Sequence, residues 1–109
     1  SYPITLGWGV QHGIACSFTL PTILQSVIGI GGFREESLKS IFGDDLIKGA
    51  DNLTVFLKQL GVGHRFADHK IPSHSFQAIV DEAFLGERGK NFVGTKESFL
   101  KVAIHRGVI

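Results

Sequence analysis

The first 33 residues contain no lysine, arginine, aspartate or glutamate, and all 21 charged residues (11 basic and 10 acidic) follow from Arg34 onward. So apolar a stretch belongs in a core, in an interface or in a membrane. A membrane-spanning helix needs about 20 predominantly apolar residues in a row. Gly13, Ser17, Pro21 and Gln25 interrupt this stretch. We therefore expect it to form the buried centre of a helical domain rather than a membrane span.

The spacing of the apolar residues predicts helices throughout. Leu46, Ala50, Leu53, Leu57 and Leu60 recur at intervals of four and three, after an aspartate that can cap a helix and before a glycine that can end one. Alternation typical of a strand is limited to residues 4–6. The expected helices are 13–30, kinked at Pro21 or divided there into two, then 35–42, 46–60, 76–85 and a last helix between Thr95 and Gly107.

The sequence therefore predicts an all-α fold, a bundle of four to five helices that occupies residues 1–109 as a single domain. The net charge of +1 gives no reason to expect nucleic acid or an anionic membrane as a partner. One cysteine excludes an internal disulfide and suits a reducing compartment such as the cytoplasm. The chain has no methionine and opens on Ser1, so we expect a piece of a larger protein.

The residues around His12 are the most distinctive chemically. His12 precedes Gly13 at the expected start of a long apolar helix, and the glycine leaves room for an ion or ligand beside the imidazole. The positive end of a helix favours neutral imidazole, which is the form that binds metal. One imidazole is too few for a metal site, because a divalent ion needs three or four protein ligands. The alternative is a capping or core histidine.

The run Gln11-His12-Gly13-Ile14-Ala15-Cys16, continuing to Leu20-Pro21 and preceded by Ser1-Tyr2-Pro3-Ile4-Thr5, resembles the iron-containing alcohol dehydrogenase family. The resemblance is specific over residues 1–21. It implies a C-terminal helical domain of the dehydroquinate synthase-like type. It also implies Fe²⁺, or Zn²⁺, held by one aspartate and three histidines, with His12 as the last of the four.

The same resemblance implies an NAD(P)-dependent enzyme for a small alcohol or aldehyde, in which the metal acts as a Lewis acid while the nicotinamide takes a hydride. The nucleotide-binding domain and the other three ligands would precede Ser1. No catalytic or cofactor-binding residue is therefore expected within this chain, which alone should be inactive and bind no metal or cofactor tightly. Homo-oligomers are expected, because the face turned to the missing domain would be apolar.

The chain departs from the family pattern in three places. Residues 1–11 lack the further histidine that the family often has a short way before the His-Gly pair. Gln11 stands where proline is commonest, and Asn91 lacks the proline that usually follows such an asparagine in the loop beside the substrate pocket. Arg88 and Lys90 in that loop could face an anionic aldehyde, or could be solvated surface cations. Trp8 could line the pocket, or could fill a core.

Other candidate residues carry weaker signals. The connector 62–75 contains His64, Asp68, His69 and His74, which could surround an ion or could simply form a polar surface loop. His105 suits the C-terminal end of a helix dipole. Cys16 is expected to be a small buried hydrophobe rather than half of a nucleophilic pair with His12.

Two further interpretations stay open. The chain could be a free-standing helical interaction module without catalysis, whose apolar first third binds a partner. It could also belong to a related metal-dependent dehydrogenase of polyols, or to a synthase with the same helical domain. An aspartate, two histidines and a glycine-rich nucleotide loop before Ser1 would favour the dehydrogenase.

Overall fold

The computed structural model describes residues 2–86 and 92–109, and this part of the chain is all-helical, with no strand. The predicted all-α class is confirmed, and residues 4–6 lie in a helix. The elements are α1 (Tyr2–Trp8), α2 (His12–Ser17), α3 (Leu20–Ser26), α4 (Gly32–Phe42), α5 (Leu46–Gln59), η1 (Phe66–His69), η2 (Ser73–Ser75), α6 (Phe76–Leu85) and α8 (Lys96–His105). No helix in these two stretches is long and apolar enough to cross a membrane.

The apolar opening third forms three short helices instead of one long one. Pro21 stands in the first turn of α3, where its missing N–H costs no helical hydrogen bond. The predicted helix 13–30 is therefore divided into shorter helices, which was the alternative to a kink. Gly9, with φ of 68°, separates α1 from α2. These breaks give α2 only 6 residues, so it depends on packing for its stability.

Two predicted helix caps are present at the starts of α5 and α8. The Asp45 carboxylate accepts a hydrogen bond from the Lys48 amide at 3.1 Å, and the Thr95 hydroxyl accepts one from the Ser98 amide at 3.1 Å. The predicted apolar stripe of α5 is buried at Leu46, Ala50 and Leu57. Its last predicted member is different: Leu60 follows the helix and is 64% exposed.

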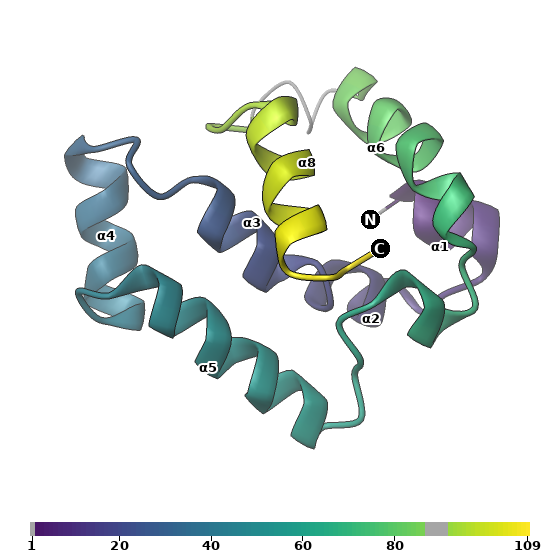
Figure 1. Ribbon diagram of the computed structural model, residues 1–109, viewed down its shortest axis with the longest axis horizontal. Helices are drawn as coiled ribbons and strands as arrows, with labels where there is room; N and C mark the ends of the chain where they lie inside the picture. The colour runs from purple at the N-terminus through teal and green to yellow at the C-terminus, as the bar shows by residue number, and fades with distance from the viewer. Residues whose placement is uncertain (1, 87–91) are drawn as a thin grey trace.

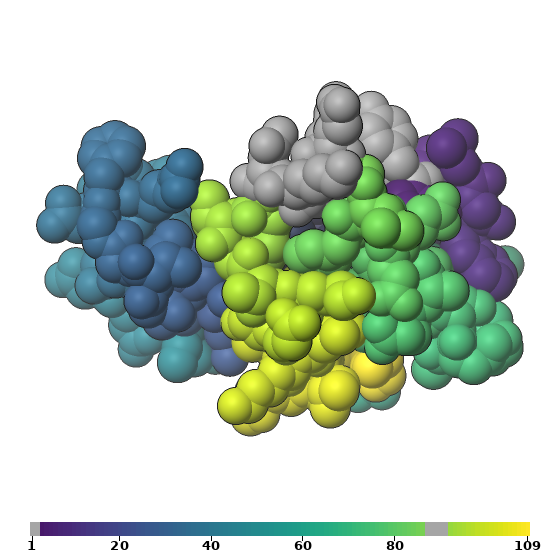
Figure 2. Space-filling view, turned by 90° about the horizontal axis from the view of Figure 1, so that it is seen from above, coloured from purple at the N-terminus to yellow at the C-terminus, as the bar shows by residue number. Residues whose placement is uncertain are grey.

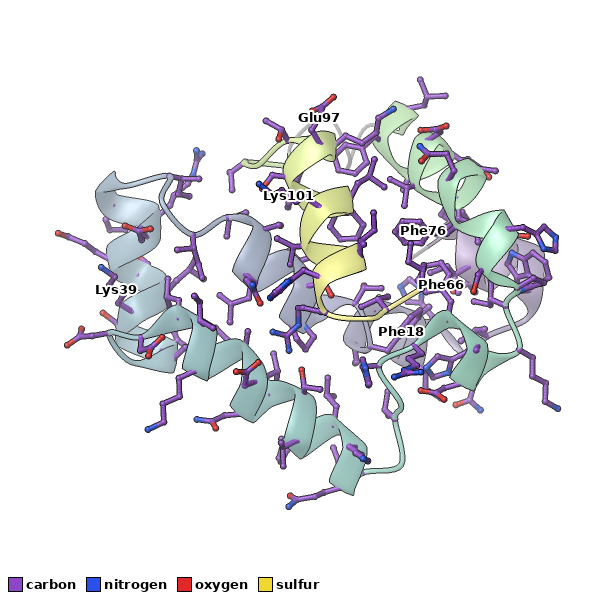
Figure 3. All side chains as sticks on the ribbon, viewed as in Figure 1. Phe18, Lys39, Phe66, Phe76, Glu97 and Lys101 are labelled. Atoms are coloured by element: carbon purple, nitrogen blue, oxygen red, sulfur yellow. The ribbon has the colours of Figure 1, made fainter. Side chains whose placement is uncertain are left out.

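Aromatic side chains from distant segments form the centre of the core. The Phe18 ring lies 5.3 Å from Phe66, which lies 5.0 Å from Phe76 (centroid to centroid). Phe76 stacks in turn on Phe99 of α8 at 6.5 Å. Figure 3 shows Phe18, Phe66 and Phe76 gathered between α2, α6 and α8. The apolar first third thus supplies part of the chain's own core, as expected.

Helix α8 lies between the α4–α5 part of the molecule and the α1–α6 part (Figures 1 and 2). Arg106, at its C-terminal end, joins it to two other helices. The guanidinium donates to Gln25 Oε1 at 2.7 Å, to Asp51 Oδ1 at 2.9 Å and to Thr54 Oγ1 at 2.7 Å. Only 11% of the Arg106 side chain is exposed. This guanidinium clasp therefore fixes α3, α5 and α8 against one another.

Candidate functional site

The loop between α1 and α2 brings His12 to the surface. Gly9 ends α1 through a hydrogen bond from its amide to the Thr5 carbonyl at 3.1 Å. The extended backbone of Gln11 then starts α2, with His12 as the first residue of the helix. His12 is exposed. The imidazole is therefore not a buried core group.

Two side chains approach the His12 ring. Thr5 Oγ1 of α1 lies 3.5 Å from Nδ1, and Cys16 Sγ lies 3.5 Å from Nε2. When Nδ1–H donates to the threonine hydroxyl, Nε2 keeps its lone pair and can bind a metal ion. The predicted ligand His12 thus belongs to a small polar group formed by α1 and α2. We call Thr5, His12 and Cys16 the His12 cluster.

Cys16 corrects a prediction from the sequence. It was expected to be buried and is exposed, because it lies four residues after His12 on the same side of α2. Ala15 and Phe18 take the buried side instead, at 0% and 1% exposure. The sulfur contacts the imidazole at 3.5 Å from Nε2, which does not by itself make the two a nucleophilic pair. The His-x-x-x-Cys spacing is the signal that could have predicted it.

Gly13 has no packing role within the described residues. A Cβ atom built on it meets no heavy atom within 4 Å. Its φ is outside the left-handed region, so the backbone does not require glycine either. The space at the Cβ position of Gly13 is therefore empty of other described residues.

Metal ligands are few across residues 2–86 and 92–109, which contain no group of three or more His, Cys, Asp or Glu side chains that could hold an ion. His12 and Cys16 can offer two donors at most. A complete site with three or four protein ligands would need donors from outside these residues.

Two of the three histidines in the connector, His64 and His69, are partly buried. His69 Nε2–H donates to the Gly63 carbonyl at 2.8 Å, and its ring packs on Phe18 with centroids 4.4 Å apart. Burial lowers the pKa of His64, and the charge of Arg65 lowers it further. His74 is exposed on η2. The described residues of the connector form no group of three metal-binding side chains. The connector is more than a surface loop, because Phe66 and Ile71 within it are each 1% exposed.

The remaining candidate residues are Trp8, Arg88, Lys90, Asn91 and His105. Trp8 ends α1 and is 40% exposed, so part of its indole could contact a substrate. Arg88, Lys90 and Asn91 lie outside the described residues. His105 is exposed in the last turn of α8, where its predicted position at the negative end of the helix is confirmed.

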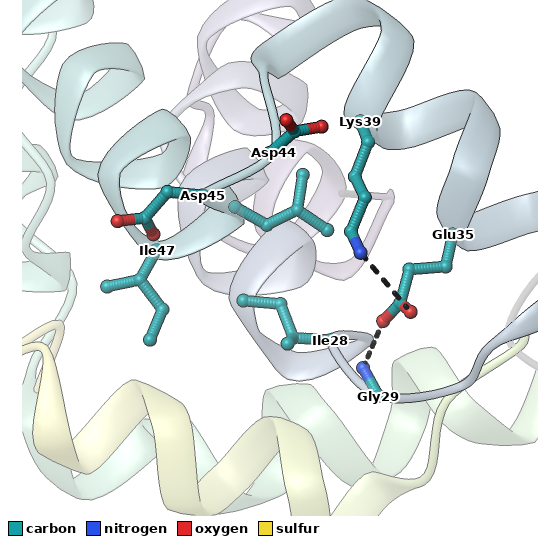
Figure 4. A pocket seen from close by; sticks show the side chains of 8 residues that line it. Ile28, Gly29, Glu35, Lys39, Asp44, Asp45 and Ile47 are labelled. Atoms are coloured by element: carbon teal, nitrogen blue, oxygen red, sulfur yellow. Dashed lines mark hydrogen bonds and ion pairs between the residues drawn. The ribbon is translucent and has the colours of Figure 1, made fainter.

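An open cleft of about 550 Å³ between α3, α4 and α5 was not predicted (Figure 4). It is lined by Ile28, Gly29, Glu35, Lys39, Asp44, Asp45, Leu46 and Ile47. Glu35 accepts a hydrogen bond from the Gly29 amide and lies 4.0 Å from Lys39, while Asp45 caps α5. Glu35 thus links α4 to the turn after α3, while the other two contacts lie within α4 and at the start of α5. Because these charged groups have structural partners, the His12 cluster is the stronger candidate for chemistry.

Comparison with known proteins identifies no relative: no protein family, no curated protein and no solved structure matches this chain.

Proposed function

We propose that this chain is the C-terminal helical part of an iron-type, nicotinamide-dependent alcohol dehydrogenase or aldehyde reductase, and that His12 is one ligand of its metal. The observation that carries the proposal is the exposed imidazole at the start of α2, whose Nδ1 lies 3.5 Å from the Thr5 hydroxyl. Gly13 adds support, because nothing within the described residues needs a glycine there.

The residues present fit part of such a site. His12 supplies one of the donors that a divalent ion needs, and no group of three exists in the described ranges. The other ligands would come from a segment that packs over the exposed side of α2. Bound iron, or zinc, would supply Lewis-acid chemistry at the alcohol oxygen, and NAD(P) would exchange the hydride.

Each residue of this region has a definite part in the proposal. His12 binds the ion, Thr5 favours the imidazole tautomer that carries its proton on Nδ1, and Gly13 leaves room for the incoming ligands. The exposed part of the Trp8 indole would form an apolar wall for a small alcohol. A cytoplasmic setting would keep the exposed Cys16 thiol reduced.

The decisive experiment uses the longer protein encoded by the reading frame that contains this sequence. We expect an aspartate, two histidines and a glycine-rich nucleotide loop before Ser1. The purified protein should contain about one iron or zinc per chain and reduce small aldehydes with NADH or NADPH, and a substrate screen should favour them over polyols. His12→Ala should lower metal affinity and activity by at least about 100-fold.

The matched control is His105→Ala, which removes an exposed imidazole from the far end of α8. It should leave metal content and activity unchanged. Full metal content in His12→Ala would refute the proposal. So would a nanomolar, stoichiometric metal site in the present 109-residue chain, because one imidazole cannot provide it.

An interaction module is the second candidate, and apolar side chains exposed on α4 and α5 favour it. Phe33 is 83% exposed, Ile41 72% and Phe56 55%. The sequence placed the partner-binding surface on the apolar first third instead, but much of that segment is buried in the core. Either candidate favours self-association of the chain. Light scattering that gives a monomer at high concentration would count against the homo-oligomer in particular.

A further inference from the structure

His12 and Cys16 form a pair of metal-binding side chains on the exposed side of α2. Imidazole nitrogen and thiolate sulfur are the donors preferred by zinc and similar thiophilic cations. Positions four apart on a helix face the same way, which is the arrangement that helical metal motifs use. Both side chains are exposed, so an ion can reach them from solvent.

The separation of the two donor atoms suits a shared ion. Zinc lies about 2.3 Å from a thiolate and about 2.0 Å from an imidazole nitrogen, so tetrahedral geometry separates sulfur and nitrogen by about 3.6 Å. Cys16 Sγ lies 3.5 Å from His12 Nε2. It also lies 4.0 Å from Nδ1, so the sulfur stands beside the ring and not on the axis of the Nε2 lone pair. Coordination of one ion by both donors therefore requires these exposed side chains to rotate about their χ angles.

We propose that His12 and Cys16 chelate a thiophilic divalent cation such as zinc, with water completing the coordination. Binding replaces the thiol proton, which passes to solvent, and no electron is transferred. Affinity is weaker than at a four-ligand structural site, because the chain provides two donors. The inference shares His12 with the proposed function but does not rest on it, since both donors belong to this chain.

The test is a titration of the chain with cobalt(II), a spectroscopic substitute for zinc, in a buffer with a non-thiol reductant. Thiolate coordination gives a sulfur-to-cobalt charge-transfer absorption in the near ultraviolet. We expect this absorption to rise to saturation, to disappear when zinc is added and to be unaffected by magnesium. Cys16→Ser should abolish it, and His12→Gln should weaken cobalt binding by at least about tenfold.

His105→Gln is the matched control and should bind cobalt as the unchanged chain does. Circular dichroism of each variant shows whether the helices persist, which the exposure of both side chains leads us to expect. Absence of the absorption in the unchanged chain overturns the inference. So does the same cobalt affinity in His12→Gln, because cysteine alone would then be the binding group.

The result is separable from the test of the dehydrogenase. The cobalt titration uses the 109-residue chain, whereas the proposed function is tested by the metal content and activity of the longer protein. If the cobalt titration fails, the metal content of His12→Ala still decides the proposed function. If the proposed function fails, the cobalt result still stands.

Discussion

The two faces of the short helix α2 contrast sharply. Its inner face consists of Ala15 and the C-cap residue Phe18, which are 0% and 1% exposed. Its outer face consists of His12 and Cys16, which are both exposed. The inner face packs into the aromatic core, while the outer face meets a threonine hydroxyl and solvent. One buried face is therefore enough to hold the helix in place, and the other face is available for chemistry.

Truncation of the inner face should have the largest effect. Phe18→Ala removes a ring that packs against Phe66 and His69. We expect it to lower the free energy of unfolding by about 4 kcal/mol, through lost burial and the cavity left behind. Urea unfolding followed by circular dichroism measures the change. A loss below about 1 kcal/mol would mean that the inner face does not hold α2.

A matched pair of neighbours tests the contrast directly. Ala15→Asn forces an amide into a fully buried position and should cost about 3 kcal/mol. Cys16→Asn places the same side chain one residue later, on the exposed face, and should change stability by less than about 0.5 kcal/mol. Urea unfolding of both variants gives the two values. Equal costs would show that the faces are not distinct.

Much of the fold could be predicted from the sequence because its signals were local. Asp45 and Thr95 mark the starts of α5 and α8 through hydrogen bonds three residues away, and the apolar stripe of α5 needs no knowledge of its neighbours. The division of the first third was harder, since the residues between the short helices are as apolar as the helices themselves. Leu60 was assigned to the stripe, yet the helix ends just before it.

The candidate site was predictable only in part. His12 followed from its position before Gly13, but its contact with Thr5 depends on how α1 packs against α2. The exposure of Cys16 was missed because an apolar sequence gives no sign of which side of a short helix will be buried. The Arg106 clasp joins residues up to 81 positions apart, and no local pattern indicates such partners.

A smaller prediction concerns the open space beside His12. Gly13→Ala adds a methyl group that meets nothing within the described residues, so we expect the present chain to gain about 0.5 kcal/mol of stability from the better helix former. Urea unfolding measures this gain. In the proposed dehydrogenase the same change should weaken metal binding, because the methyl group would crowd the incoming ligands. A destabilised chain would show that the position is packed after all.

The smallest expected effect is a dependence on pH. Burial and the charge of Arg65 lower the pKa of His64 below its ordinary value, while Asp68 opposes the shift. The unfolded chain therefore binds this proton more readily, so stability should fall as the pH drops through about 6.5. Urea unfolding at about pH 8 and about pH 5.5 should show a smaller fall in His64→Gln than in the unchanged chain. An identical fall in both would exclude His64 as a source of the dependence.

The guanidinium clasp also bears on the order of events when the chain is made. Arg106 joins α3 and α5, and the Val108 carbonyl accepts the Phe66 amide at 2.8 Å. A ribosome releases α3 and α5 long before either of these late residues leaves its exit tunnel. The helices α3 and α5 can already pack on each other through Leu24, Leu46 and Ala50 at that stage. The hydrogen bonds that tie α8 to them, and the connector to the C-terminal end, form only after Arg106 and Val108 have emerged.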